Sequence, residues 1–454
     1  MRKFRRSIMI LCKFLLTAAM AGLFLFVFFN WYDEVYFFFK GNLVLLFLYL
    51  FIYSMFMYSY GGYKIGALRL RELVFSNAAA AFLTNFVTYF IMCLITYRML
   101  EVWPLLVCFA AQAILSVLLY WLAFRLNEWF YPPVGALLIR SADAQDIAMA
   151  DAFIRKSTRY LVRETLVGQS YEQIVAIAKD YNVLVTGMLD TKLRSRLMAY
   201  CFETGRQLFI LPALEDIMLN SAAQYMAEDL LVYRCRNRAF TPDQLAVKRA
   251  MDIGFSVLLM LFTLPITLLT ALAVKLYDGG PVFYKQERLT RHGQTFQLLK
   301  FRSMIPDAEK RTGAVRACDA DPRVTPVGRF IRACRIDELP QLLNVLKGEM
   351  SLVGPRPERP EIFAEICRDF PQFAYRLKVK AGITGYAQLY GKYNTDFGDK
   401  VRLDLLYIEK ASILQDLQLL FYTFKILFMK DSTAGVDAAQ TAGVENETDE
   451  QPLS

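Results

Sequence analysis

Two adjacent carboxylates, Asp337 and Glu338, lie among arginines in the segment Arg-Ala-Cys-Arg-Ile-Asp-Glu-Leu-Pro-Gln, residues 332–341. An ionised carboxylate can act as a nucleophile or a metal ligand, and its neighbour can complete the metal site or transfer a proton. The guanidinium groups of Arg332 and Arg335 can clamp an anionic substrate. The pattern therefore suits phosphate chemistry. A lone Asp-Glu pair is more often a solvated helix terminus, so the choice depends on the surrounding sequence.

The composition argues against several other kinds of chemistry. Of the 454 residues, 56% are hydrophobic, and the mean hydropathy is +0.30, which indicates a membrane protein with soluble parts. The single histidine, His292, and eight cysteines without Cys-x-x-Cys spacing argue against zinc sites and Ser-His-Asp triads. The net charge of +9 favours anionic lipids and phosphate substrates as partners and disfavours nucleic acid.

The elements that must position the two carboxylates begin with four apolar runs, each long enough to cross a bilayer core. The runs cover residues 8–29, 43–60, 78–97 and 104–124. Basic residues precede the first run, separate the second from the third, and follow the fourth. The positive-inside rule therefore places both ends of a four-helix transmembrane bundle, residues 1–125, in the cytoplasm. We expect this bundle to be an anchor without chemistry of its own.

Residues 132–233 alternate short apolar runs with amphipathic stretches, a pattern typical of an α/β domain with a parallel sheet. We expect a Rossmann-like fold that faces the cytoplasm. A dinucleotide-binding fold would carry Gly-x-Gly-x-x-Gly, but residues 135–140 read Gly-Ala-Leu-Leu-Ile-Arg and lack the glycines that let a pyrophosphate approach a helix. A regulatory or packing role is therefore expected here, without a bound dinucleotide.

A fifth apolar segment, residues 253–274, has basic residues on both sides and Pro265 in its middle. The flanking charges call for both ends in the cytoplasm, and a proline interrupts helical hydrogen bonding. A re-entrant helix over residues 250–274, which enters and leaves the membrane on one face, satisfies both demands. The alternative is a plain fifth span kinked at Pro265, which would place everything after residue 275 outside the cell.

The segment after residue 246 contains an ordered series of further motifs. They are Lys248-Arg249 with Asp252, Gly280-Pro281-Val282-Phe283, Gln286 with Arg288, Lys300-Phe301-Arg302-Ser303-Met304, Asp321-Pro322-Arg323, Gly328-Arg329, the run at Asp337, Asn344 to Gly348, and Met350 to Glu358. With these motifs, residues 246 to about 428 resemble the bacterial sugar transferase family, the monotopic polyprenyl-phosphate phosphoglycosyl transferases. The preceding spans and α/β region resemble the long form of this family. Ala381 departs from the family, which often has proline at this position.

The resemblance implies a two-step reaction. Asp337 would attack the β-phosphate of a UDP-sugar, release UMP and hold an aspartyl phosphosugar, which undecaprenyl phosphate then accepts. Glu338 would be a metal or acid/base partner, and both carboxylates would bind Mg²⁺. The residues assigned to substrate binding are Arg332, Arg356, Lys300, Arg302, Arg323 and Gln341.

Local sequence adds to these assignments. Pro340 suits the first turn of a helix that runs through Leu346 and ends at Gly348. Asp337 and Glu338, the carboxylate dyad, would then lie by the positive end of the helix dipole. The prolines on both sides of Arg356 predict a rigid, extended segment that presents one guanidinium. The other cations, Lys300, Arg302 and Arg323, could instead form a basic surface for lipid headgroups.

The predicted fold is an α-helical membrane bundle, a Rossmann-like α/β domain, and a mainly α-helical catalytic domain, residues 246–430, anchored by the re-entrant helix. Residues 431–454 should be a disordered tail. The predicted setting is the bacterial inner membrane, with the soluble domains facing the cytoplasm and a homo-oligomer as a possible assembly.

The predicted function is the first membrane step of exopolysaccharide, capsule or O-antigen synthesis. No residue pattern selects the sugar, and UDP-glucose or UDP-galactose follows from the long-form resemblance alone. Two alternatives come from other classes of protein. One is a non-catalytic scaffold of a polysaccharide machine, and the other is an NAD-dependent nucleotide-sugar dehydratase, which the missing glycines disfavour.

Overall fold

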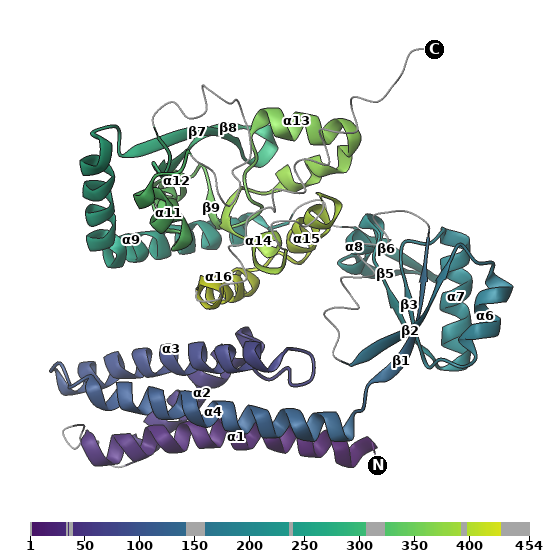
Figure 1. Cartoon of the computed structure of the whole chain (residues 1–454), viewed down its shortest axis with the longest axis horizontal. Coiled ribbons are helices and arrows are strands. Elements are labelled where there is room, and N and C mark those ends of the chain that lie inside the picture. The colour runs from purple at the N-terminus through teal and green to yellow at the C-terminus, as the bar shows by residue number, and fades with distance from the viewer. Residues whose placement is uncertain are drawn as a thin grey trace. The chain divides into compact units, whose positions relative to one another are not determined.

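The computed structural model describes residues 2–32, 35, 40–141, 159–235, 239–305, 323–391 and 397–427. The chain forms two compact units, Met1–Ala213 and Leu214–Ser454, which are described separately here (Figure 1). The boundary between them falls inside the range 132–233 that the sequence assigns to the α/β domain. The predicted tail, residues 431–454, lies outside the described residues.

The first unit begins with four long apolar helices. They are α1 (Arg2–Trp31), α2 (Gly41–Ser59), α3 (Leu70–Thr96) and α4 (Trp103–Phe130), and each is long and apolar enough to cross a membrane. Inside the bundle, Gln112 on α4 accepts a hydrogen bond from Asn85 Nδ2 at 2.9 Å and donates one to the Tyr49 hydroxyl at 2.8 Å. Such pairing is required where no water reaches the polar groups. The prediction of four long apolar helices is confirmed.

The first unit also contains a four-stranded parallel sheet. Its strands are β1 (Val134–Arg140), β2 (Tyr160–Val167), β3 (Val183–Thr186) and β4 (Gln207–Ile210), in the order β2-β1-β3-β4. The crossover helices α6 (Tyr171–Ala178) and α7 (Thr191–Thr204) cover one face, where Leu137 and Ile139 pack against Ile174 and Leu197 (Figure 1). Strands β1 and β3 are buried on both faces, which explains their continuous apolar sequences. The parallel sheet is therefore confirmed, while its identity as a Rossmann-like domain stays a prediction.

The second unit is mainly helical. Its elements are α8 (Leu214–Asn220), β5 (Ala223–Ala227), β6 (Leu230–Arg234), α9 (Pro242–Asp278), β7 (Phe283–Leu289), η1 (Arg291–Gly293), β8 (Thr295–Phe301), α11 (Pro326–Ala333), η2 (Ile336–Glu338), α12 (Gln341–Lys347), β9 (Ser351–Val353), α13 (Pro360–Asp369), η3 (Pro371–Lys378), β10 (Gly382–Thr384), α14 (Tyr386–Tyr390), α15 (Phe397–Lys410) and α16 (Ile413–Leu427). Strands β7 and β8 pair antiparallel, as do β5 and β6, whereas β9 and β10 pair parallel.

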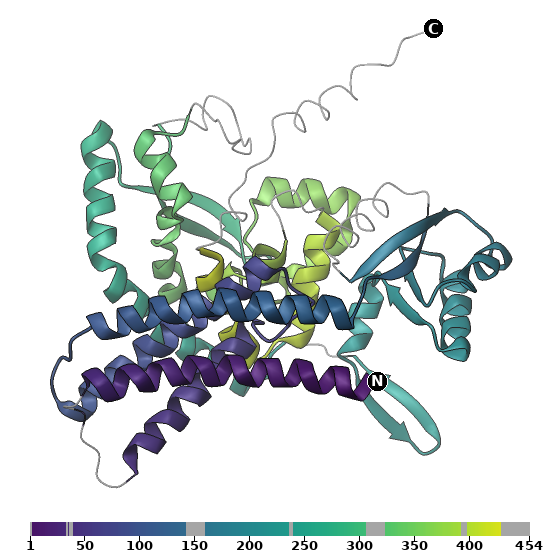
Figure 2. The same ribbon diagram turned by 60° about the horizontal axis from the view of Figure 1, so that its bottom comes forward.

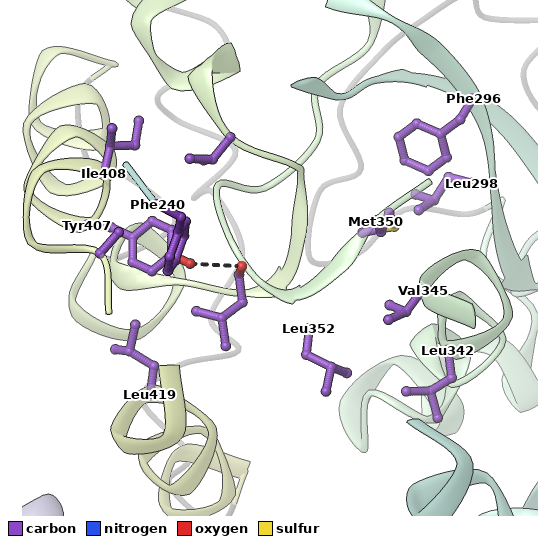
Figure 3. Packing of buried hydrophobic residues seen from close by; sticks show 13 residues of the cluster. Phe240, Phe296, Leu298, Leu342, Val345, Met350, Leu352, Tyr407, Ile408 and Leu419 are labelled. Atoms are coloured by element: carbon purple, nitrogen blue, oxygen red, sulfur yellow. Dashed lines mark hydrogen bonds between the residues drawn. The ribbon is translucent and has the colours of Figure 1, made fainter. Parts of the chain in front are cut away.

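One hydrophobic core joins the strands and helices that flank the carboxylate pair. It takes Leu298 from β8, Val345 from α12, Leu352 from β9, Ile408 from α15 and Leu419 from α16 (Figure 3). Large-to-small changes in such a core cost about 2–5 kcal/mol each, so the packing fixes the relative positions of these five elements.

The fifth apolar segment forms a single helix, α9, of 37 residues, with Thr241 as its cap. Figures 1 and 2 show that α9 bends into two arms. Proline is the usual cause of a sharp helix kink, and Pro265 lies inside α9. The predicted break is therefore a bend within a continuous helix. The path of this helix through a membrane stays a prediction.

Candidate active site

The carboxylate pair lies in a tight turn between two short helices. Helix α11 is capped by Thr325, whose hydroxyl accepts a hydrogen bond from Gly328 N at 2.9 Å. After α11 the backbone takes a left-handed conformation at Arg335, φ 55°, which is uncommon for a residue other than glycine. Asp337 and Glu338 then form the 3₁₀ turn η2, directly before α12.

The short helix after the dyad agrees with the sequence. Pro340 takes the N-cap position of α12, and Gly348, at φ 89°, ends the helix. Only glycine adopts such a conformation without steric cost. The predicted helix that runs through Leu346 and ends at Gly348 is confirmed, but Pro340 is its N-cap rather than a residue of its first turn.

Two cations from distant parts of the sequence reach the dyad. The Nζ atom of Lys300, on β8, lies 3.0 Å from Glu338 Oε1 and 3.9 Å from Asp337 Oδ2. The Nη2 atom of Arg356, after β9, lies 3.2 Å from the same oxygen of Glu338. Both of these residues were assigned to substrate binding from the sequence, and the structure places both at the dyad.

The two carboxyl groups have opposite electrostatic surroundings. Burial raises the pKa of Asp337, and Glu338 raises it further, while Lys300 and Arg332 oppose the shift. Burial also disfavours the charged form of Glu338, but Lys300 and Arg356 outweigh it and hold the pKa of Glu338 below its usual range. Glu338 is therefore a fixed anion at neutral pH, and Asp337 is the carboxyl whose proton affinity is enhanced.

Asn344 on α12 fixes the distance between the dyad and Lys300. Its side-chain oxygen accepts a hydrogen bond from Leu299 N at 3.0 Å, and its Nδ2 donates to Gln297 O at 2.8 Å. Because Asn344 is fully buried, these bonds hold α12 against β8 next to Lys300. The motif from Asn344 to Gly348 marks this residue in the sequence, but its positioning role follows from these contacts.

The first turns of α9 hold β9, the strand that leads to Arg356. Lys248 Nζ donates to Asp416 Oδ2 at 2.5 Å and to Val353 O at 3.2 Å. The Tyr407 hydroxyl lies 2.8 Å from Asp416 Oδ1 and 3.1 Å from Val353 O, the contact drawn in Figure 3, so its single proton is shared between these two acceptors. Asp252 accepts hydrogen bonds from the Ser351 hydroxyl and Leu352 N, both at 3.1 Å. Sequence reasoning missed Tyr407 and Asp416, which no motif singled out.

Of four further predicted site residues, Arg332 acts on the dyad, whereas Arg302 and Arg323 contact other groups. Arg332 Nε donates to Ser303 Oγ at 2.8 Å, close enough to Asp337 to influence its pKa. Arg302 is buried and forms an ion pair with Asp278 at the end of α9. Gln341 is buried at the start of α12, and the carbonyl of Arg323 accepts a hydrogen bond from Ile305 N at 3.0 Å. Their roles in substrate binding stay predictions.

The carboxylate oxygens of the dyad are ligands of the kind that Mg²⁺ prefers. Mg²⁺ is commonly bound by one or two carboxylates together with substrate phosphates and water, and the two adjacent carboxylates match that donor set. The Oε1 atom of Glu338 contacts both Lys300 and Arg356. Among the described residues, no group of three or more His, Cys, Asp or Glu side chains could hold a metal by itself. Substrate phosphate and water would supply the other oxygen ligands of an ion held by the two carboxylates.

The arrangement as a whole suits attack on phosphorus. It has a buried carboxylate, 8% exposed, beside an anion that is fixed by two cations. Three cations surround the position where a phosphate must meet Asp337. They are Lys300 on β8, Arg332 on α11 and Arg356 after β9. Catalysis of phosphoryl transfer consists largely of positioning the reactants and stabilising the charge of the phosphoryl group.

Comparison with known proteins gives a consistent result. The family model described as "Bacterial sugar transferase" matches residues 243–430. The chain is 44% identical over 186 residues to an undecaprenyl-phosphate glucose phosphotransferase of Komagataeibacter xylinus, with 39% of this chain and 35% of the relative covered. It is 33% identical over 242 residues to an undecaprenyl-phosphate galactose phosphotransferase of Salmonella typhimurium, with half of each chain covered.

A third relative is covered over most of its length. It is a putative undecaprenyl-phosphate N-acetylgalactosaminyl 1-phosphate transferase of Bacillus subtilis, 50% identical over 137 residues, which are 30% of this chain and 76% of the relative. The match to the first two relatives spans half of their length or less. All of the site residues described above lie within residues 243–430.

Proposed function

The chain belongs to the bacterial sugar transferase family of polyprenyl-phosphate phosphoglycosyl transferases, and from this premise we propose that it transfers a hexose 1-phosphate from a UDP-sugar to undecaprenyl phosphate and releases UMP. The observation that carries the proposal is the ion cluster in which Lys300 contacts both carboxylates of the dyad and Arg356 contacts Glu338. Such a cluster suits a nucleophilic carboxylate that must approach an anionic phosphate.

In the first step, a carboxylate oxygen of Asp337 attacks the β-phosphorus of the UDP-sugar. A bond forms between that oxygen and phosphorus, and the bond from phosphorus to the oxygen that bridges the two phosphates breaks. UMP leaves with the bridging oxygen, and an aspartyl phosphosugar remains. Lys300 and Arg332 offset the negative charge of the attacked phosphate.

In the second step, a phosphate oxygen of undecaprenyl phosphate attacks the same phosphorus. The bond to Asp337 breaks, which regenerates the free carboxylate and gives undecaprenyl diphosphosugar. Glu338 stays ionised through both steps and keeps Lys300 and Arg356 oriented toward the phosphate. Asp337 and Glu338 would also hold Mg²⁺, which when bound supplies further neutralisation of phosphate charge.

We place this reaction at the cytoplasmic face of the bacterial inner membrane, as the first membrane step in building a surface polysaccharide. The five helices that are long and apolar enough to cross a membrane support an integral membrane location. The sugar is proposed to be glucose or galactose, which the names of two of the relatives mention. The third relative makes an N-acetylated hexose the competing choice.

The test compares Asp337→Asn with the parent protein. The full chain in detergent, supplied with Mg²⁺, undecaprenyl phosphate and a panel of UDP-sugars, should release UMP with one preferred sugar. The Asn variant should lose that activity about 10³-fold or more, because an amide oxygen is a poor nucleophile. A labelled sugar donor without acceptor should leave label on the parent protein and none on the variant.

Glu287→Gln is the matched control, since it removes an exposed carboxylate on β7 that is not one of the proposed site residues. It should keep the parent rate. Undiminished UMP release from Asp337→Asn would exclude Asp337 as the nucleophile. A parent protein that releases UMP from no sugar in the panel would favour the scaffold alternative.

A further inference from the structure

A second cationic site lies away from the dyad, in a cavity of about 660 Å³ in the second unit. Basic side chains from three segments line it. Lys248 and Arg249 come from α9, Arg291 from η1, and Lys378 and Lys380 from the end of η3 and the residues after it. None of the residues proposed above to contact substrate lines this cavity.

The positive charge of this cavity is poorly compensated. Among the described residues that line it, Asp252 is the acidic one, and its carboxylate already accepts two hydrogen bonds from β9. Lys248 is neutralised by Asp416. Burial and the charges of Arg249 and Arg291 lower the pKa of Lys380, as expected where cations outnumber anions.

Two of the cations contact neutral groups of the protein. Arg249 donates to the carbonyls of Val345 and Leu346, at 2.5 and 2.7 Å, and Lys380 Nζ donates to Gly348 O at 2.6 Å. These carbonyls belong to the last turn of α12, whereas the dyad precedes its first turn. The cavity and the dyad therefore lie at opposite ends of α12, and the charges of Arg249 and Lys380 remain available to an anion.

The remaining wall of the cavity is apolar, with Phe240, Leu245 and Leu377 among its residues. The cavity lies beside residues 245–252 of α9, directly before the apolar stretch whose side chains are exposed, such as Leu261 and Phe262. If α9 enters the membrane as proposed above, the cavity lies at the level of the lipid headgroups. Cationic and apolar walls together suit a ligand with a phosphate and an apolar part.

We propose that this cavity binds the phosphate group of an anionic ligand at a site separate from Asp337, with a phospholipid headgroup as the favoured source and free phosphate as the other. Arg291 and Lys378 are the residues to change, because their side chains line the cavity without holding the carbonyls of α12. Neither of them belongs to the proposed catalytic machinery.

The experiment uses the full chain in neutral detergent at fixed ionic strength. Dihexanoyl phosphatidic acid and inorganic phosphate serve as probes in separate titrations, with dihexanoyl glycerol as the uncharged lipid control, and binding is followed by calorimetry. The parent protein should bind phosphatidic acid. The double variant Arg291→Gln with Lys378→Gln should bind it at least tenfold more weakly.

The matched control is Lys285→Gln with Lys410→Gln, which removes the same charge from exposed positions outside the cavity. It should bind within twofold of the parent. Inorganic phosphate could lose affinity in the Arg291/Lys378 variant to the same extent as the lipid and compete fully with it. That result would support the phosphate site and identify free phosphate as the source. If inorganic phosphate competes weakly, the source is lipid.

The proposal would be overturned if the parent and the Arg291/Lys378 variant bound both probes with equal affinity. It would also be overturned if the parent bound neither probe. The variant must keep the unfolding temperature and UMP release of the parent for the comparison to hold. If it does not fold, Lys378→Glu, at an exposed side chain, provides the second variant and should also weaken binding at least tenfold.

Discussion

The two neighbouring carboxylates of the dyad differ in how their charge is stabilised. Glu338 has two cations within 3.2 Å, whereas the ion pair of Asp337 with Lys300 is longer, at 3.9 Å. Pairs of carboxyl groups whose pKa values are pushed apart commonly divide their roles. This difference supports the roles proposed above, in which Glu338 is the fixed anion that orients the cations and Asp337 forms the bond with phosphorus.

The pH dependence of the first step should report the ionisation of Asp337. Because Lys300 lowers the pKa of Asp337, the Lys300→Met change should raise that pKa and reduce the ionised fraction at any given acidic pH. The acid limb of single-turnover UMP release should therefore move to higher pH, in addition to a lower maximum rate. Rates measured across the acidic range for parent and variant check this prediction.

Lys285→Met is the control for the change at Lys300, since Lys285 is exposed on the neighbouring strand β7. Its acid limb should coincide with that of the parent. An acid limb of Lys300→Met that is unmoved or lies at lower pH would exclude the proposed electrostatic role.

At the scale of the elements, α9 serves the site through its polar first turns. Lys248 and Asp252 bind β9 or the groups next to it, and Arg249 binds the end of α12. In the sequence, Lys248 and Arg249 are among the basic residues that flank the fifth apolar segment and predict its membrane topology. In the structure Lys248 is buried in an ion pair with Asp416, so its charge does not face lipid headgroups.

Breaking the buried pair should destabilise the second unit. Removing one partner leaves an uncompensated buried charge, so Asp416→Leu or Lys248→Met should cost about 3–5 kcal/mol. Replacing both, as Lys248→Met with Asp416→Leu, should recover much of that loss because no charge remains buried. Denaturant unfolding of the four proteins in detergent measures the effect. A double variant as unstable as the sum of the singles would contradict this account.

The strand β9 approaches its neighbour too closely for a side chain at Gly354. A Cβ atom there would lie 2.3 Å from Lys380 O and 3.0 Å from Gly382 N, both backbone atoms. Gly354→Ala should therefore cost about 1–3 kcal/mol and displace Arg356, with a loss of UMP release. Gly254→Ala is the control, since nothing lies within 4 Å of its added Cβ. It should be neutral or slightly stabilising, and unfolding curves with UMP release distinguish the two.

At the scale of the whole molecule, the proposed site residues all fall within the second unit, Leu214–Ser454. The long apolar helices α1–α4 and the parallel sheet lie in the first unit, and the sheet has hydrophobic cores of its own. The reaction proposed here needs its catalytic unit on the side of the membrane that holds UDP-sugars. The bend of α9 is the feature that permits both of its ends to lie on that side.

Topology can be tested at two exposed positions of α9. Val247 is 54% exposed and Leu276 is 75% exposed, whereas the buried Lys248 would be a poor site for labelling. In a chain without other cysteines, Val247→Cys and Leu276→Cys should both react with an impermeant maleimide only when the cytoplasmic face is accessible, as in inverted vesicles. Labelling of the two positions from opposite faces would exclude the re-entrant path and favour a fifth span.

The sequence alone determined the local features of this protein. Apolar runs of sufficient length predicted the four helices of the bundle, and alternating short runs predicted the parallel sheet. Pro340 and Gly348 predicted where α12 begins and ends, because each residue restricts or permits particular backbone angles. Such features depend on neighbours in the chain, so one sequence is enough to predict them.

The tertiary structure decided which side chains meet. Lys300, Arg302 and Arg356 are equally basic in the sequence, yet Lys300 and Arg356 reach Glu338 while Arg302 pairs with Asp278. Asn344, Tyr407 and Asp416 became visible as positioning residues only through their contacts. Ion pairs and packing between distant segments depend on how β8, β9, α9 and α12 come together around one core, which spacing along the chain does not encode.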